Sequence, residues 1–107
     1  MGGMIWGISA ALHEATEIDE RAARYVNTDL AEYLIPVNAD IHDIDVILVP
    51  EKDDDVNPLG IKGIGELGNV GMNAAVANAV YHATGIRVRE IPIRLEQLLK
   101  APVLAHV

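Results

Sequence analysis

One carboxylate in this sequence stands among glycines, in the segment Lys62-Gly63-Ile64-Gly65-Glu66-Leu67-Gly68-Asn69-Val70-Gly71. Because glycine has no side chain to crowd Glu66, the segment favours close approach of a ligand or of another backbone. A carboxylate in such a place could accept a proton as a general base. The simpler interpretation is a first-turn acid that the dipole of the following helix stabilises by about 0.3–1 kcal/mol. From the residues alone, both interpretations stay open.

The same glycines match the dinucleotide-binding pattern Gly63-x-Gly65-x-x-Gly68, and Glu90 lies about as far downstream as that pattern requires. The pattern needs a strand that runs directly into the glycines, whereas the strand predicted here ends near Val49. Glu66 would also face the pyrophosphate and repel it. Dinucleotide binding is therefore the weakest of the alternatives.

The acidic run at 53–57 begins like a calcium-binding loop. However, Pro58 occupies the position that requires glycine, and Ile64 occupies the position that requires glutamate. The sequence therefore predicts no metal ligand of its own.

The composition narrows the class of partner. The 107 residues carry a formal charge of −8, and half of them are hydrophobic. The negative charge argues against nucleic acid and anionic membrane surfaces as partners. The lack of cysteine excludes disulfides and iron–sulfur ligation within this chain. No apolar run reaches the length of a membrane span, so cytoplasmic location is the default expectation.

Helical spacing marks two longer segments. Residues 2–15 carry apolar side chains on one face and the small residues Gly3 and Gly7 on another, which predicts a helix that packs closely on a second backbone. Residues 70–84 repeat the apolar spacing, and Gly85 is a typical residue to end such a helix.

The remaining elements are shorter. Alternating or β-rich residues predict strands at about 41–49 and 86–93, and a short helix is expected over residues 95–99. Residues 27–29 offer capping side chains, but residues 30–35 fit a short helix and an extended segment equally well. The sum predicts an α+β fold with two main helices packed on a small sheet.

The glutamate segment and the helix after it resemble the C-terminal end of molybdenum hydroxylases, the xanthine dehydrogenase and aldehyde oxidase family, in the molybdopterin-binding catalytic subunit. The resemblance rests on Lys62-Gly63-Ile64-Gly65-Glu66 and on a small-residue helix that ends in Tyr81-His82-Ala83-Thr84-Gly85. Three further segments agree in order, at 2–14, 27–36 and 87–93. The variant Gly65-Glu66-Leu67-Gly68 is most similar to bacterial, aldehyde-oxidising members with separate subunits.

The resemblance implies that Glu66 is the active-site base. In that family the base takes a proton from a hydroxyl on molybdenum, and the oxygen then attacks an aldehyde or an N-heteroaromatic carbon. Lys62 and the backbone of Gly63 and Gly65 would lie near the cofactor and position Glu66. Residues 1–107 would be the C-terminal segment of the molybdopterin-binding domain.

The resemblance also implies cofactors and partners that this chain does not hold by itself. Molybdenum–molybdopterin would bind in the complete subunit, and iron–sulfur centres and FAD would belong to partner domains or subunits. Because the family subunit is several times longer, we expect residues 1–107 to be a fragment that is inactive alone. Export with a partner subunit would place it in the periplasm. The alternative is a non-catalytic module that self-associates as a homo-oligomer, or docks on a partner, through the Gly3/Gly7 face.

Overall fold

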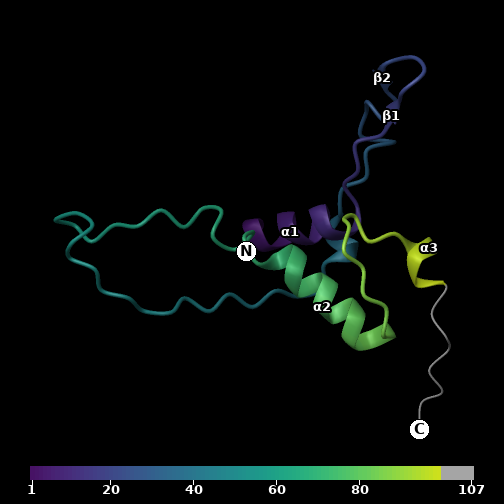
Figure 1. The fold of residues 1–107 in the computed structure, drawn as a ribbon. Coiled ribbons are helices and arrows are strands. Elements are labelled where there is room, and N and C mark those ends of the chain that lie inside the picture. The colour runs from purple at the N-terminus through teal and green to yellow at the C-terminus, as the bar shows by residue number, and fades with distance from the viewer. Residues whose placement is uncertain (100–107) are drawn as a thin grey trace, which may run out of the picture.

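The computed structural model describes residues 1–99. Two helices, α1 (Gly2–Leu12) and α2 (Met72–Thr84), pack against each other, and a two-stranded hairpin and a long loop project away from them (Figure 1). The α+β class is therefore confirmed. None of the helices in residues 1–99 is long and apolar enough to cross a membrane.

The two longer helices form where their spacing predicted them. α1 ends three residues earlier than expected, and Ala11 near its end is fully buried. α2 ends at Gly85, whose φ of 73° lies in the left-handed region that favours glycine. The N–H of Gly85 donates to the Tyr81 carbonyl at 2.7 Å, which closes the last turn of α2.

The sheet lies elsewhere in the sequence than predicted. The strands are β1 (Ile18–Asp19) and β2 (Arg24–Tyr25), which pair antiparallel with Ile18 opposite Tyr25. The Asp19 carboxylate accepts the N–H groups of Arg21 and Ala22 at 3.0 and 3.1 Å, and so stabilises the turn between the strands.

The predicted strand at 41–49 is wrong. Within residues 1–99 this segment is extended but pairs with no other strand, and it follows the single-turn helix η1 (Asn38–Asp40). Ile47 is 81% exposed and Val49 is 84% exposed, although their side chains suit a buried strand. A strand needs a ladder partner, and the described residues offer none.

The predicted strand at 86–93 is also wrong, because this segment packs against a helix instead. The N–H of Ile93 donates to the Ala11 carbonyl at 2.7 Å, and Val88 and Ile93 are buried. The apolar alternation predicted burial only in part, because Ile91 of the same segment is 51% exposed. Helix α3 (Leu95–Leu98) follows, as expected.

Residues 30–35, which the sequence left open, form a turn rather than a helix or strand. The Asp29 carboxylate accepts the N–H groups of Ala31 and Glu32 at 2.9 and 3.1 Å. Asp29 therefore caps one turn, as the sequence at 27–29 suggested, and Pro36 follows it.

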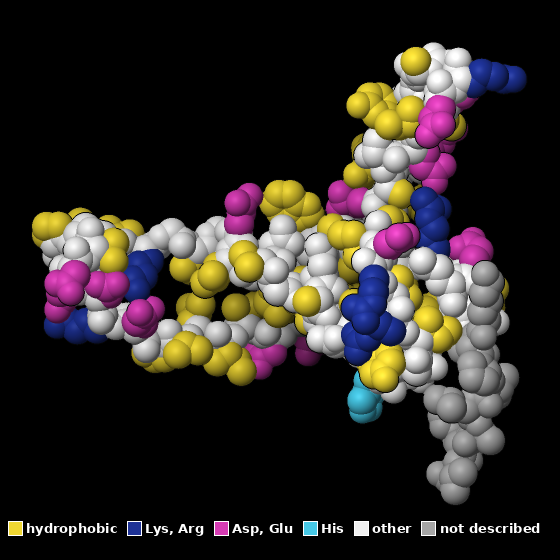
Figure 2. Space-filling model, in the orientation of Figure 1, with side chains coloured by type: hydrophobic (Ala, Val, Ile, Leu, Met, Phe, Trp, Pro, Cys, Tyr) yellow, Lys and Arg dark blue, Asp and Glu magenta, His cyan; other side chains and the backbone are white. Residues whose placement is uncertain are grey.

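The arrangement is open for its length. Its radius of gyration is 18.2 Å, whereas a compact chain of this length has a value of about 13 Å. Its accessible surface is 8953 Å², against about 5,800 Å² for a compact protein of this mass. Hydrophobic side chains lie on the surface along the projecting loop and on the hairpin (Figure 2). The chain thus exposes apolar surface that a compact domain would bury.

Candidate functional site

Glu66 lies in a series of tight turns that leads into α2. The Leu67 N–H donates to the Ile64 carbonyl at 3.2 Å, and the Asn69 N–H donates to the Glu66 carbonyl at 3.0 Å. Each bond reaches back three residues, which is the spacing of 3₁₀ structure. α2 begins at Met72, and no acid lies in its first turn. The interpretation of Glu66 as a helix-capping acid is therefore wrong.

The carboxylate of Glu66 is accessible. The residue is exposed, and among residues 1–99 its carboxylate takes part in no hydrogen bond or ion pair. A Cβ built on Gly63 or on Gly65 would meet nothing within 4 Å. Both glycines that precede Glu66 thus leave open space beside it, where a substrate or cofactor could approach.

The backbone that carries Glu66 rests on α1. A Cβ built on Gly3 would lie 3.3 Å from the Asn69 nitrogen and 3.3 Å from the Gly65 oxygen. The prediction of close packing at Gly3 and Gly7 is confirmed, but the packed backbone belongs to this same chain. The expectation that a second molecule docks through the Gly3/Gly7 face is therefore wrong. Asn69, whose N–H closes the turn on the Glu66 carbonyl, was not expected from the sequence. Its position three residues after Glu66 was the signal that could have found it.

Lys62 is held by two acids of the projecting loop. Its ammonium nitrogen lies 3.0 Å from Glu51 Oε1 and 3.1 Å from Asp53 Oδ2, and its side chain is 32% exposed. These ion pairs join the two limbs of the loop just before the glycines. The positioning of Glu66 by Lys62, through this loop, stays a prediction.

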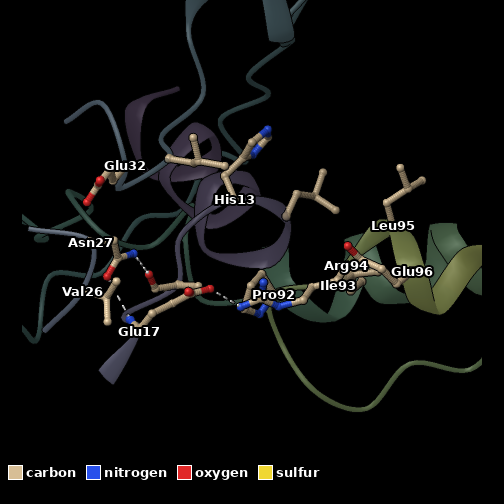
Figure 3. Close-up of a pocket in the computed structure, with 13 residues that line it drawn as sticks. His13, Glu17, Val26, Asn27, Glu32, Pro92, Ile93, Arg94, Leu95 and Glu96 are labelled. Carbon is tan, nitrogen blue, oxygen red and sulfur yellow. Dashed lines mark hydrogen bonds and ion pairs between the residues drawn. The ribbon is translucent and has the colours of Figure 1, made fainter. Parts of the chain in front are cut away.

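A cavity of about 510 Å³ lies at the other end of α1, away from Glu66. Figure 3 shows Glu17 between Asn27 and Arg94 on its wall. The Arg94 guanidinium donates to Glu17 Oε1 at 3.0 Å, and the Glu17 N–H donates to Asn27 Oδ1 at 2.9 Å. Because these groups satisfy one another, we interpret them as contacts that join the hairpin to residues 92–96.

Tyr33 lies near the same end of α1, and among residues 1–99 it is the titratable group whose pKa is clearly shifted. Its hydroxyl donates to Glu14 Oε2 at 3.1 Å, and this bond to a carboxylate raises the pKa of Tyr33 above the usual 10.0. The negative charge of Glu14 acts in the same direction. The pair ties the turn at 29–33 to the segment that follows α1, at the end of α1 opposite to Glu66.

Known proteins match this chain over nearly all of its length, although no family model matches it. The aldehyde oxidoreductase molybdenum-binding subunit PaoC of Escherichia coli K12 is 50% identical over 99 residues, which are 92% of this chain and 14% of that protein. The xanthine dehydrogenase molybdenum-binding subunit of Escherichia coli O157:H7 is 32% identical over 97 residues, 91% of this chain and 13% of that protein.

A solved structure shares the fold. The crystal structure of quinoline 2-oxidoreductase from Pseudomonas putida 86 superposes with a TM-score of 0.74 at 29% identity, over 94% of this chain and 14% of that one. The chain thus spans about one seventh of the length of the relatives it matches. The fold of this chain therefore also occurs as a segment of a much longer chain.

Proposed function

Because this chain belongs to the xanthine dehydrogenase family and matches a segment of its molybdenum-binding subunit, we propose that Glu66 is a general base in a molybdenum-dependent hydroxylation. The substrate would be an aldehyde or an N-heteroaromatic compound, and the oxygen would come from water. The observation that carries the proposal is the Glu66 carboxylate itself, which is exposed, is unpaired within residues 1–99 and is flanked by open glycines.

A general base needs access to the proton that it removes. Glu66 has that access because Gly63 and Gly65 place no side chain between the carboxylate and the open space. As a base, it would accept the proton of the attacking oxygen, and such proton transfer contributes about 10²–10⁴-fold to a rate. The side chain would then have to lie within hydrogen-bond reach of that oxygen.

The described residues fit one wall of a molybdenum cofactor site. The backbone of Gly63 and Gly65 would face the cofactor, because a Cβ at either position meets nothing. When bound, the cofactor supplies the redox centre that accepts two electrons from the substrate. No cluster of three or more metal-ligating side chains occurs among residues 1–99, so the other contacts would come from the rest of a longer subunit.

The partner that the open shape requires would be the remainder of that subunit. The chain exposes about 3,100 Å² more surface than a compact protein of its mass. In quinoline 2-oxidoreductase the same fold is embedded in a chain of which it covers 14%. The projecting loop and hairpin would therefore be covered by other parts of the subunit, and iron–sulfur and FAD subunits would carry the electrons away. Residues 1–107 alone would be inactive.

Substitution of the base tests this proposal. In a complete subunit that carries these residues, Glu66→Gln should lower kcat by about 10²–10⁴-fold, because glutamine cannot accept the proton. Molybdenum and pterin contents should match those of the unchanged subunit. Glu20→Gln, which removes one carboxylate from the turn of the hairpin, away from Glu66, is the matched control and should keep full activity. If Glu66→Gln retains the activity of that control, Glu66 is not the base.

A further inference from the structure

Seven of the nine glycines of this chain lie in α1 or in the 63–71 segment that carries Glu66, and they fall into two structural classes. At Gly2, Gly63, Gly65 and Gly71, a built Cβ meets nothing within 4 Å. At Gly3, Gly7 and Gly68, it meets atoms of the facing segment at 3.3 Å or less. The first class leaves space open, whereas the second class lets α1 and the facing segment pack closely against each other.

The touching glycines lie on both sides of one contact. On the α1 side, a Cβ built on Gly3 would lie 3.3 Å from two atoms of the turn. One is the oxygen of Gly65, which precedes Glu66, and the other is the nitrogen of Asn69, which closes the turn. From the turn, Gly68 faces back, and its Cβ would lie 3.0 Å from Met4 Cγ and 3.4 Å from the Met4 nitrogen.

One helical turn further along α1, Gly7 makes the tightest approach. Its Cβ would lie 2.3 Å from Met72 Cβ and 2.8 Å from Asn69 Oδ1. Real atoms do not come so close, so any side chain at Gly7 would push α1 and the start of α2 apart. The hydrogen bonds between residues 64 and 72 would pass that movement on to the turn of Glu66.

The position of the Glu66 carboxylate depends on this backbone contact. Among residues 1–99 the carboxylate has no side-chain or backbone partner that could hold it from another direction. Its place is therefore set by the turn, and the place of the turn is set by α1. In a reaction that needs near-attack geometry, a shift of about 1 Å can cost about 10²-fold in rate.

We propose that Gly3, Gly7 and Gly68 are positioning residues, whose close contact between α1 and the 65–69 turn sets the location of the Glu66 carboxylate. The proposal rests on the role of Glu66 as the base, given above. It gives Gly63 and Gly65 a different role, which is to leave room beside Glu66, and it predicts that alanine lowers kcat at Gly68 but not at Gly71, where an added Cβ meets nothing.

The test uses Gly68→Ala in a complete subunit that carries these residues. Its added methyl group meets chiefly Met4 Cγ, so the turn should move while the fold persists. We expect kcat to fall about 10–100-fold, with KM, molybdenum content and thermal midpoint close to those of the control. The control is Gly71→Ala, where a Cβ meets nothing and φ is −99°, and it should keep full kcat.

A second variant separates positioning from general destabilisation. Met4→Ala removes the Cγ atom that Gly68→Ala would meet, so the double variant Met4→Ala/Gly68→Ala should recover most of the lost kcat. Recovery of kcat without a change in cofactor content supports a positioning role. If Gly68→Ala keeps the kcat of Gly71→Ala, or loses cofactor and thermal stability in proportion to activity, the proposal is overturned.

The outcome for Glu66→Gln distinguishes this proposal from the one on which it rests. If Glu66→Gln is inactive and Gly68→Ala behaves like Gly71→Ala, only the positioning role fails. If Glu66→Gln is fully active, the base assignment fails, and with it the reason for positioning.

Discussion

The open structure predicts how residues 1–107 behave when they are expressed without the rest of a subunit. The accessible surface of 8953 Å² exceeds the value of about 5,800 Å² for a compact protein of this mass by about 3,100 Å². Obligate interfaces bury about 2,000–5,000 Å² in total, so the excess is large enough to be one side of such an interface. Only Ala11, Val88 and Ile93 are buried apolar residues among those described. We expect this core to be too small to fold the chain cooperatively alone.

Small-angle scattering combined with light scattering measures the shape and the mass of the isolated chain together. A monomer that lacks its covering surfaces should show a radius of gyration of at least the 18.2 Å of the structure, and no cooperative thermal transition. A monomer with a radius of gyration near 13 Å and one sharp transition would refute the reasoning, because such a chain covers its own apolar surface. A stable dimer would show instead that a second copy covers the exposed apolar surface of the isolated chain.

A matched pair of loop variants tests where the surface is covered. Ile47 is 81% exposed here, and full burial of its side chain in a complete subunit would stabilise that subunit by about 1.5–3 kcal/mol. Ile47→Asp should therefore lower the thermal midpoint of the complete subunit, whereas Asp55→Asn in the same loop should not. Equal midpoints for the two variants would show that Ile47 stays in water.

Three further predictions concern contacts around the helices. Because the bond to Glu14 raises the pKa of Tyr33, the stability that this pair adds is complete below pH 10.0 and is lost as the pH rises through the raised value. The absorbance change that accompanies ionisation of Tyr33, obtained by subtracting the titration of Tyr33→Phe, should therefore occur at a lower pH when Glu14 is replaced by Gln. Lys62→Met should lower activity by no more than about 30-fold, since two partly exposed ion pairs contribute at most about 2 kcal/mol together. Steady-state kinetics decide this, and a loss as large as that of Glu66→Gln would contradict it. Gly85→Ala should destabilise the last turn of α2 by about 1–2 kcal/mol, because its φ of 73° is strained for alanine; hydrogen exchange should show faster opening there than in Gly71→Ala.

Patterns that depend on local sequence predicted the structure well. Helical spacing located α1 and α2, and Gly85 marked the end of α2 because its left-handed conformation is local chemistry. The small residues at Gly3 and Gly7 correctly indicated close backbone contact. Spacing alone could not show that the contacted backbone is the turn of the same chain that carries Glu66.

Features that depend on distant partners could not be predicted in this way. The segments at 41–49 and 86–93 have strand-like residues, but a strand forms only where another strand supplies hydrogen bonds. One segment instead packs on α1 through Ile93, and the other stays unpaired within residues 1–99. The hairpin at Ile18–Tyr25 was missed because each of its strands is only two residues long, too short to show an alternating pattern.

The reductive half-reaction of the complete subunit tests the central claim most directly, because it isolates the step in which Glu66 would remove a proton. Rapid mixing of the oxidised enzyme with excess substrate gives both the rate of reduction and the apparent substrate dissociation constant. For Glu66→Gln with full cofactor content, we predict reduction slowed by about 10²–10⁴-fold and a dissociation constant close to that of Glu20→Gln. Reduction at the rate of Glu20→Gln would contradict the account.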